Sequence, residues 1–418
     1  MKQKIINIVM IIMIIALPMA IIPGKMYNMP KMYILLVGSG ILAVLTCFEY
    51  KKIVLDKKDI LILIFAILAL LSTICSGNIK TAILGNYNRY EGLLSIYSYL
   101  VLYFCSKYFL NYKKITLLKI LYAVYIPICL LGIAQYYIKP ESYKLYPIFN
   151  KNACGTFGNT NFMSSFVSMG LPIFVTTYIL NNSKISLFTS SIVFFCLVAC
   201  MARSGWVASI LFFAILIIYL IKNRKKEYFK RAFIILMIFV AIFLMLYFQK
   251  QSVVKNKIRV VKNDVLKITQ NRAQNEIGSG RLQIWKVTLE LMQKYPILGV
   301  GPDNMEQGIM NNLTPMSIDY IVKTKTKIDK AHNEYLQIGA TIGIPALIVY
   351  LTFLALTIIP KLKLAFKDKD LFIVINTIIV YLVQAFFNIS TIGIAPLLWI
   401  ALGIIDNKNF EQNQLQQQ

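Results

Sequence analysis

The chain has 418 residues, of which 58% are hydrophobic, and its mean hydropathy is +0.65. Soluble globular domains average roughly 45–50% apolar residues, so the composition excludes an ordinary soluble protein. The net charge of +26 is scattered over segments between apolar runs, which disfavours nucleic-acid binding.

Apolar runs of about 17–25 residues recur from end to end, and each is long enough to cross a hydrocarbon core of ~30 Å as a helix. Lipid offers no partner to exposed backbone groups, so helices are the expected form. The fold class is therefore an all-α, polytopic transmembrane bundle of about 12 helices. The runs lie near 5–22, 32–48, 59–76, 92–110, 115–138, 161–180, 185–202, 205–221, 232–249, 334–358, 371–388 and 390–405.

Basic residues predict the orientation. The first run resembles a signal peptide, but no small-residue cleavage site follows it, so we expect a retained helix. With the N-terminus in the cytoplasm, the short inner segments hold 21 Lys and Arg and the short outer ones hold 8. This positive-inside bias predicts that both termini are cytoplasmic.

One segment is long and falls outside under this topology. We expect four parts: helices 1–9 in 1–249, an extracytoplasmic loop in 250–333, helices 10–12 in 334–406 and a cytoplasmic tail in 407–418. The loop carries 14 Lys and Arg against 7 Asp and Glu. Either a solvated basic face or attraction of an anionic substrate or headgroup explains this excess.

The loop also contains an amphipathic helical pattern. Apolar residues recur at helical spacing from Leu282 to Met292, with Ser279 as a candidate cap and Pro296 as a stop. Arg281 lies in the first turn of this helix. It is either a solvated surface residue or a ligand for an anion that the free helix N–H groups also bind.

Three further outer stretches hold polar residues. LGNYNRYEGL contains Arg89 among interfacial tyrosines. In ACGTFGNTNFMSSF, Asn159 or Asn161 is suited to capping the following helix. In the hinge MARSGW, Arg203 either extends to the interface or binds an anion.

The only histidine is His332, in KAHNEYLQIGATIG, where the polar loop gives way to an apolar run. Such a residue is usually just interfacial, but Asn333 follows it and Gly343 comes later in the same motif. The seven cysteines form no CxxC pair, and no metal-ligand spacing or nucleotide-binding loop occurs. We therefore expect no cofactor and no metal.

These motifs, in this order, resemble the O-antigen ligase family, which includes polysaccharide polymerases and membrane oligosaccharyltransferases. The matching pieces are GTFGNTNF, ARSG, GRLQIWKVTLELMQKYPILGVGPDNM and AHNEYLQIGATIGIP, over about 153–345. The resemblance implies a C-type glycosyltransferase fold in a bacterial cytoplasmic membrane, with its active site on the extracytoplasmic face. It implies transfer of a glycan from an undecaprenyl-diphosphate carrier to an acceptor hydroxyl, without a metal.

The resemblance places the family's essential histidine on His332 and its two essential arginines on Arg281 and Arg203. A histidine with a pKa near ~6.5 is mostly neutral at pH 7 and can accept a hydroxyl proton. Two guanidinium groups suit the charge that builds on a diphosphate leaving group. Asn333, Asn159, Asn161 and Arg89 are candidate supporting residues.

The expected partners are a lipid-linked glycan, a glycan or other hydroxyl acceptor, and membrane lipids. Ligase, polymerase and protein O-glycosyltransferase activities all fit. The alternative is a transporter or flippase for lipid-linked oligosaccharide, which needs a polar path through the bundle. The helix interiors offer few candidates for one, namely Lys119, Gln135 and Gln384.

Overall fold

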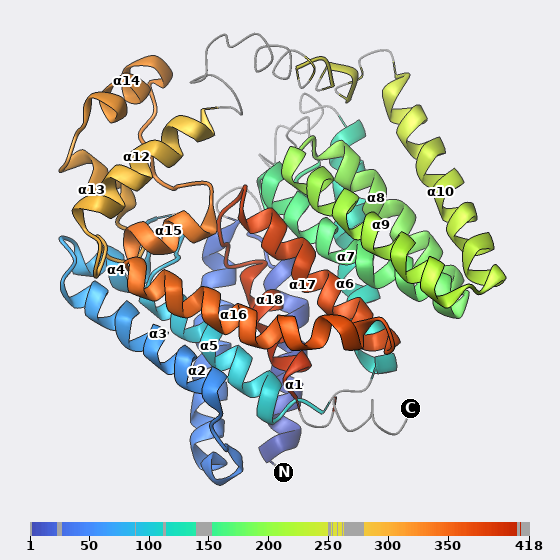
Figure 1. The fold of residues 1–418 in the computed structure, drawn as a ribbon, viewed down its shortest axis with the longest axis horizontal. Helices are drawn as coiled ribbons and strands as arrows, with labels where there is room; N and C mark the ends of the chain where they lie inside the picture. The colour runs from blue at the N-terminus through green and yellow to red at the C-terminus, as the bar shows by residue number, and fades with distance from the viewer. Residues whose placement is uncertain are drawn as a thin grey trace.

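The structure is a computed structural model that describes residues 2–22, 27–87, 89–111, 114–138, 153–249, 252, 254–256, 258–260, 262, 280–407 and 410. Over these residues the chain forms helices and no strand, which confirms the all-α class. Figure 1 shows long helices packed side by side, with a group of shorter helices at one end.

The long helices follow the predicted runs closely. Seven of them, α1, α2, α6, α7, α9, α10 and α16, are long and apolar enough to cross a membrane by length and composition. The helices that correspond to predicted runs are α1 (Lys2–Met19), α2 (Asn28–Phe48), α3 (Lys57–Ile74), α5 (Leu93–Tyr108), α6 (Lys114–Tyr137), α7 (Thr160–Asn181), α8 (Lys184–Ala199), α9 (Arg203–Asn223), α10 (Lys226–Tyr247), α16 (Ile344–Ala365), α17 (Lys369–Ala385) and α18 (Ala395–Ile405). Of these, α18 has only 11 residues and covers the last part of the predicted run 390–405.

The predicted run 334–358 is not one helix. It divides into α15 (Glu334–Thr341) and α16, with Gly343 between them at φ 109°. A Cβ built on Gly343 lies 2.0 Å from the carbonyl oxygen of Ile297, so only glycine fits this close approach. Hydropathy misses the break because the residues on both sides are apolar.

Residues 280–343 form what we call the loop domain. It contains α12 (Arg281–Lys294), α13 (Met305–Met310), α14 (Pro315–Thr324) and α15. The predicted amphipathic helix is confirmed as α12, and the predicted cap Ser279 lies outside the described residues. The buried face of α12, which includes Ile284, Val287 and Leu291, packs with Met305 and Ile328 in a separate small core.

The central helix of the bundle is α7, in which 94% of the apolar window is buried inside the protein. It packs against α8, α9 and α17, while α18 packs against α5. Small α4 (Ile79–Leu84) lies beside α3 and α5 next to the loop domain (Figure 1). The loop domain thus rests on the ends of α3, α5 and α17.

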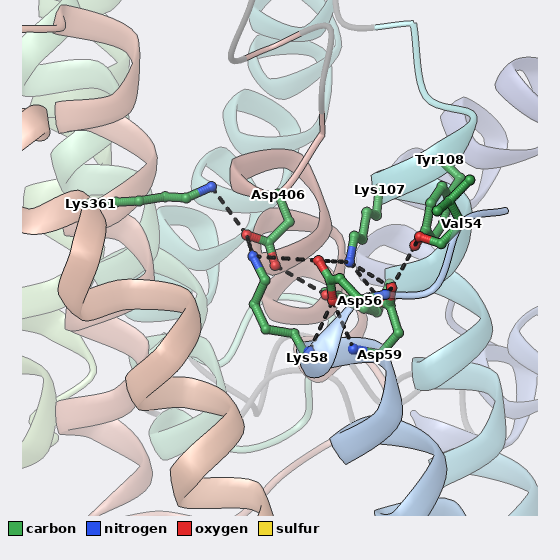
Figure 2. Close-up of polar contacts among 9 residues, drawn as sticks. Val54, Asp56, Lys58, Asp59, Lys107, Tyr108, Lys361 and Asp406 are labelled. Atoms are coloured by element: carbon green, nitrogen blue, oxygen red, sulfur yellow. Dashed lines mark hydrogen bonds and ion pairs between the residues drawn. The ribbon is translucent and has the colours of Figure 1, made fainter.

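Buried ion pairs tie helices together at the opposite end of the bundle (Figure 2). The Lys107 ammonium lies 2.8 Å from carboxylate oxygens of both Asp59 and Asp56. Asp406, just after α18, pairs with Lys58 at 2.6 Å and Lys361 at 3.1 Å. Because Asp59 and Asp406 side chains are fully buried, these charges need each other.

Replacing Lys107 with Met is expected to destabilise the bundle strongly. It leaves the Asp59 carboxylate buried without its cation, and breaking a buried pair this way costs about 3–5 kcal/mol. Thermal unfolding of the purified chain in detergent measures the loss. The matched control is Lys323→Met, because that lysine pairs with Asp319 on the exposed surface and such pairs contribute little. Equal melting temperatures for the two variants would contradict a stabilising role of the cluster.

The predicted orientation gives a second expected result. In a background without native cysteines, Ile297→Cys, at a position 67% exposed in the loop domain, should react with a membrane-impermeant maleimide in intact cells. Lys51→Cys, at an exposed position beyond the other end of α2, should react only after permeabilisation. The reverse pattern would place the loop domain in the cytoplasm.

Candidate active site

The segment that carries His332 is anchored by the preceding turn of the loop domain. The backbone N–H of Val300 donates to the Ala340 carbonyl at 3.1 Å, and that of Gly301 donates to Thr341 at 2.8 Å. These bonds hold residues 300–301 against the end of α15. The Tyr335 hydroxyl near the beginning of α15 donates to the Leu382 carbonyl of α17 at 2.8 Å, and the Ser72 hydroxyl of α3 donates to the Thr341 carbonyl at 2.8 Å, so α15 is fixed relative to the bundle.

His332 lies two residues before α15 with a left-handed backbone, φ 50°. This conformation costs a non-glycine residue about 1–2 kcal/mol, so contacts with neighbouring residues must stabilise it. Asn333 does part of this, because its side-chain oxygen accepts a hydrogen bond from Leu336 N at 3.0 Å and caps α15. Strained residues of this kind cluster at functional sites.

Arg203 and Arg281, which are far apart in sequence, approach each other at the end of α17. Arg203 is the first residue of α9, and a Cβ on neighbouring Gly205 lies only 2.9 Å from the Gln384 amide nitrogen of α17. On the other side, the Trp285 ring of α12 meets Phe386 at 5.4 Å. Both arginines therefore begin helices that pack on the same end of α17.

The charges of these groups act on one another. Burial lowers the pKa of Arg281, and the positive charge of Arg203 lowers it further. Burial also lowers the pKa of His332 to about 4, and the charges of Arg281, Arg89 and Lys330 lower it while Asp329 opposes them. The structure thus brings the three predicted residues into one cationic site with a neutral imidazole at pH 7.

Arg89 joins this site through a carboxylate that sequence reasoning missed. Its Nε and Nη2 donate to the same oxygen of Asp329 at 3.0 and 2.6 Å. Its guanidinium also lies 6.0 Å from the ring centre of Phe162 in the first turn of α7. Burial alone raises the pKa of Asp329, but the charge and hydrogen bonds of Arg89 lower it below its ordinary value. The two partners are 240 positions apart, so no local pattern reveals the pair.

A second missed carboxylate positions the turn that carries Arg89. Asp303 accepts hydrogen bonds from the backbone of Asn86 at 2.6 Å and Glu91 at 3.2 Å. It also forms a buried ion pair with Lys330. The sequence feature that could have pointed to Asp303 is the GPDN turn, within which Asp303 adopts φ 58°. Asp303 and Lys330 therefore join the turn at 86–91 to the segment that carries His332.

The predicted asparagines act on the backbone. Asn159 caps α7 by accepting from Asn161 N at 2.8 Å, which confirms the predicted cap, and the Asn161 carbonyl accepts from Asn388 Nδ2 at 3.2 Å. The basic excess of the loop is partly neutralised, because Lys323 pairs with Asp319 and Lys327 pairs with Glu306. These two lysines are therefore paired with carboxylates and do not form an unpaired basic surface.

Comparison with known proteins identifies a family for part of the chain. Residues 188–351 match the family model described as O-antigen ligase. The resemblance inferred from the sequence motifs is confirmed over this O-antigen ligase segment. No curated protein matches the chain significantly.

The O-antigen ligase segment includes Arg203, Arg281 and His332, whereas Arg89, Asn159 and Asn161 precede it. Its family supports a membrane role in glycan transfer. The three groups that meet near the end of α17 are thus the ones that the matched segment contributes.

Proposed function

We propose that this protein transfers or polymerises a glycan from an undecaprenyl-diphosphate-linked donor to an acceptor hydroxyl, on the outer face of the bacterial cytoplasmic membrane. His332 is the general base. Arg281 and Arg203 bind the donor diphosphate. Arg89, which Asp329 holds in place, is a supporting residue for the negative charge of the diphosphate. The reaction as proposed uses no metal.

The observation that carries the proposal is that Arg281 lies near both other residues, since the charge of Arg203 acts on Arg281 and the charge of Arg281 acts on His332. They come from α9, α12 and the turn before α15, and each belongs to the O-antigen ligase segment. Structural arginines ordinarily neutralise carboxylates, but the charge that acts on Arg281 most after burial is another cation, Arg203. Two neighbouring guanidinium groups are a natural site for a dianion such as a diphosphate.

The chemistry requires one proton transfer and one displacement. The acceptor oxygen forms a bond to the anomeric carbon of the donor sugar while the bond from that carbon to the diphosphate oxygen breaks. The acceptor proton passes to the imidazole of His332, and the diphosphate leaves with the bonding electrons. The arginines donate hydrogen bonds to the oxygens on which negative charge develops, which lowers the barrier.

The low pKa of His332 predicts an unusual pH profile. A base with a pKa of about 4 in the free enzyme stays unprotonated above that pH, so kcat/KM should stay level from pH 7 to about pH 5. The negative charge of a bound donor diphosphate stabilises the protonated imidazole and so raises the pKa of His332 in the complex. As a result, kcat should begin to fall at a higher pH than kcat/KM. Profiles from pH 4 to 8 test this; a kcat/KM limb at or above pH 6.5 would contradict it.

The alternative function, a transporter of lipid-linked oligosaccharide, has less support. Both buried glutamines are engaged in structural hydrogen bonds. Gln135 accepts from Cys154 N at 3.0 Å and Gly155 N at 2.7 Å, and Gln384 donates to Ser164 and Ser168 at 3.3 Å. Lys119 lies on the exposed surface.

Purified chain in detergent micelles separates the two functions. Given lipid-linked glycan and an acceptor extract, a transferase forms a glycosylated product and releases the lipid diphosphate without a bilayer. A transporter yields neither, because translocation needs two compartments. Absence of product from protein that remains folded would refute the transferase.

A further inference from the structure

A cavity with largely apolar walls and a few buried polar groups lies beside the candidate active site and is not used by the chemistry above. It encloses about 640 Å³, including its open mouth, between the loop domain and the ends of α3, α5, α16 and α18. Lys330 and Glu334 line it, two residues before and two after His332. His332 does not line the cavity, so we infer that its imidazole lies on another side of segment 330–334, toward Arg281 and Arg89, whereas Lys330 lines the cavity.

Three carboxyl groups line this cavity, those of Glu91, Asp303 and Glu334, and Asp303 forms the ion pair with Lys330 described above. Glu91 accepts from the hydroxyls of Tyr99 at 2.8 Å and Ser390 at 3.1 Å. Each carboxylate oxygen has two lone pairs, so it can accept a further hydrogen bond.

Glu334 is bonded in the same manner. Its carboxylate accepts hydrogen bonds from the hydroxyls of Tyr350 at 3.1 Å and Tyr381 at 3.0 Å, and Glu334 is 7% exposed. Burial raises the pKa of both Glu91 and Glu334 to about 7, so each group can donate as well as accept near neutral pH.

The cavity also has an unused donor and aromatic walls. The Gln337 side-chain oxygen accepts from Ala331 N at 2.8 Å, but its buried amide nitrogen has no hydrogen-bond partner among the described residues. Buried polar groups of this kind are nearly always satisfied in native proteins, which indicates a missing partner. Tyr99 and Trp399 form part of the wall.

These features select a ligand class. A phosphate is disfavoured because three carboxyl groups and a single lysine, Lys330, line the cavity, and an acyl chain offers no partner to the buried Gln337 amide. Metal binding is disfavoured because no three His, Cys, Asp or Glu side chains converge anywhere in the described ranges. A neutral ring with several hydroxyls fits: its O–H groups donate to the carboxyls, its oxygens accept from the amide, and its C–H faces contact aromatic rings.

We propose that this cavity binds the sugar ring of the glycan acceptor. The inference rests on the proposed function, since it assigns the acceptor to the side of segment 330–334 opposite the arginines. Glu91 and Glu334 accept hydrogen bonds from hydroxyls that do not react, and Gln337 donates one. The reactive hydroxyl lies toward His332, so the acceptor and donor reach the base from two sides.

Fluorescence of Trp399 provides a direct test of binding. The chain has three tryptophans, so Trp206→Phe and Trp285→Phe leave Trp399 as the reporter in the cavity wall. Full-length protein in micelles is titrated with methyl glycosides of common hexoses and N-acetylhexosamines in both anomeric forms. At least one glycoside should produce a saturable change in emission. A panel without any saturable change would overturn the proposal.

Variants of the cavity assign the binding groups. Replacing a carboxylate acceptor with the weaker, neutral amide should weaken glycoside binding about tenfold in Glu91→Gln and Glu334→Gln. Gln337→Leu is a third variant in case one of these fails to fold. Glu306→Gln is the matched control, because that carboxylate lies in the loop domain and pairs with Lys327 away from the cavity. Weaker binding in at least one folded cavity variant supports the site; unchanged binding in all of them overturns it.

His332→Ala separates this inference from the proposed function. The variant should bind glycosides like the parent and lack transfer activity. If His332→Ala still transfers glycan, the proposed chemistry fails whether or not the cavity binds sugar. If transfer depends on His332 but the cavity binds no glycoside, only the cavity inference fails.

Discussion

Replacing His332 with Ala is expected to reduce glycan transfer by about 10²–10⁴-fold while expression and membrane insertion stay normal. The side chain is the only imidazole in the chain, and burial together with the charges of nearby cations lowers its pKa to about 4, so it is neutral at pH 7. Initial rates with lipid-linked glycan, measured at equal amounts of folded protein, give the change.

His332→Gln separates a base from a positioning residue. Glutamine can hydrogen-bond to the acceptor but cannot take its proton, so this variant should be nearly as impaired as His332→Ala. Lys327→Ala is a suitable control, because Lys327 is an exposed residue of the same segment that pairs with Glu306. If His332→Gln keeps most of the activity, the side chain orients the acceptor and is not the proton acceptor.

Arg281→Ala is expected to lower kcat by about 10²–10³-fold, the typical loss when one donor to a developing oxyanion is removed. Arg281→Lys keeps the charge and loses the planar fork that binds two oxygens at once, so its activity should lie between those of the wild type and Arg281→Ala. The same measurement with donor concentration varied separates an effect on kcat from one on KM.

Lys294→Ala provides the control for Arg281. It removes one positive charge from the exposed last turn of the same helix, so general electrostatic attraction changes equally while the site stays intact. Full activity of both Arg281→Ala and Arg281→Lys would remove Arg281 from the site.

The bundle could be predicted from sequence because hydropathy measures the property that creates it. Runs of apolar residues define most of the bundle helices to within a few residues, and the helical recurrence of apolar residues from Leu282 to Met292 predicts α12, although Leu282 and Leu289 lie on its exposed side. The division of 334–358 into α15 and α16 could not be predicted this way. It depends on a close contact between Gly343 and Ile297, and no average over a window contains that contact.

The candidate site shows the same contrast. Arg203, Arg281 and His332 are isolated polar residues in distinctive motifs, so the sequence alone is enough to select each of them. Asp329 and Asp303 could not be selected in this way, because an acidic residue in a basic loop looks like ordinary surface. Their roles depend on partners more than 200 positions away in the chain, Arg89 and the backbone of Asn86.

A double-mutant cycle of Arg281→Ala and His332→Ala tests most directly whether the two residues serve one reaction. Transfer from lipid-linked glycan is measured for purified wild type, both single variants and the double variant. Residues that act in one catalytic unit give strongly non-additive losses. The double variant should therefore be no slower than the worse single variant, within error. Losses that multiply would contradict a shared site for the diphosphate and the base.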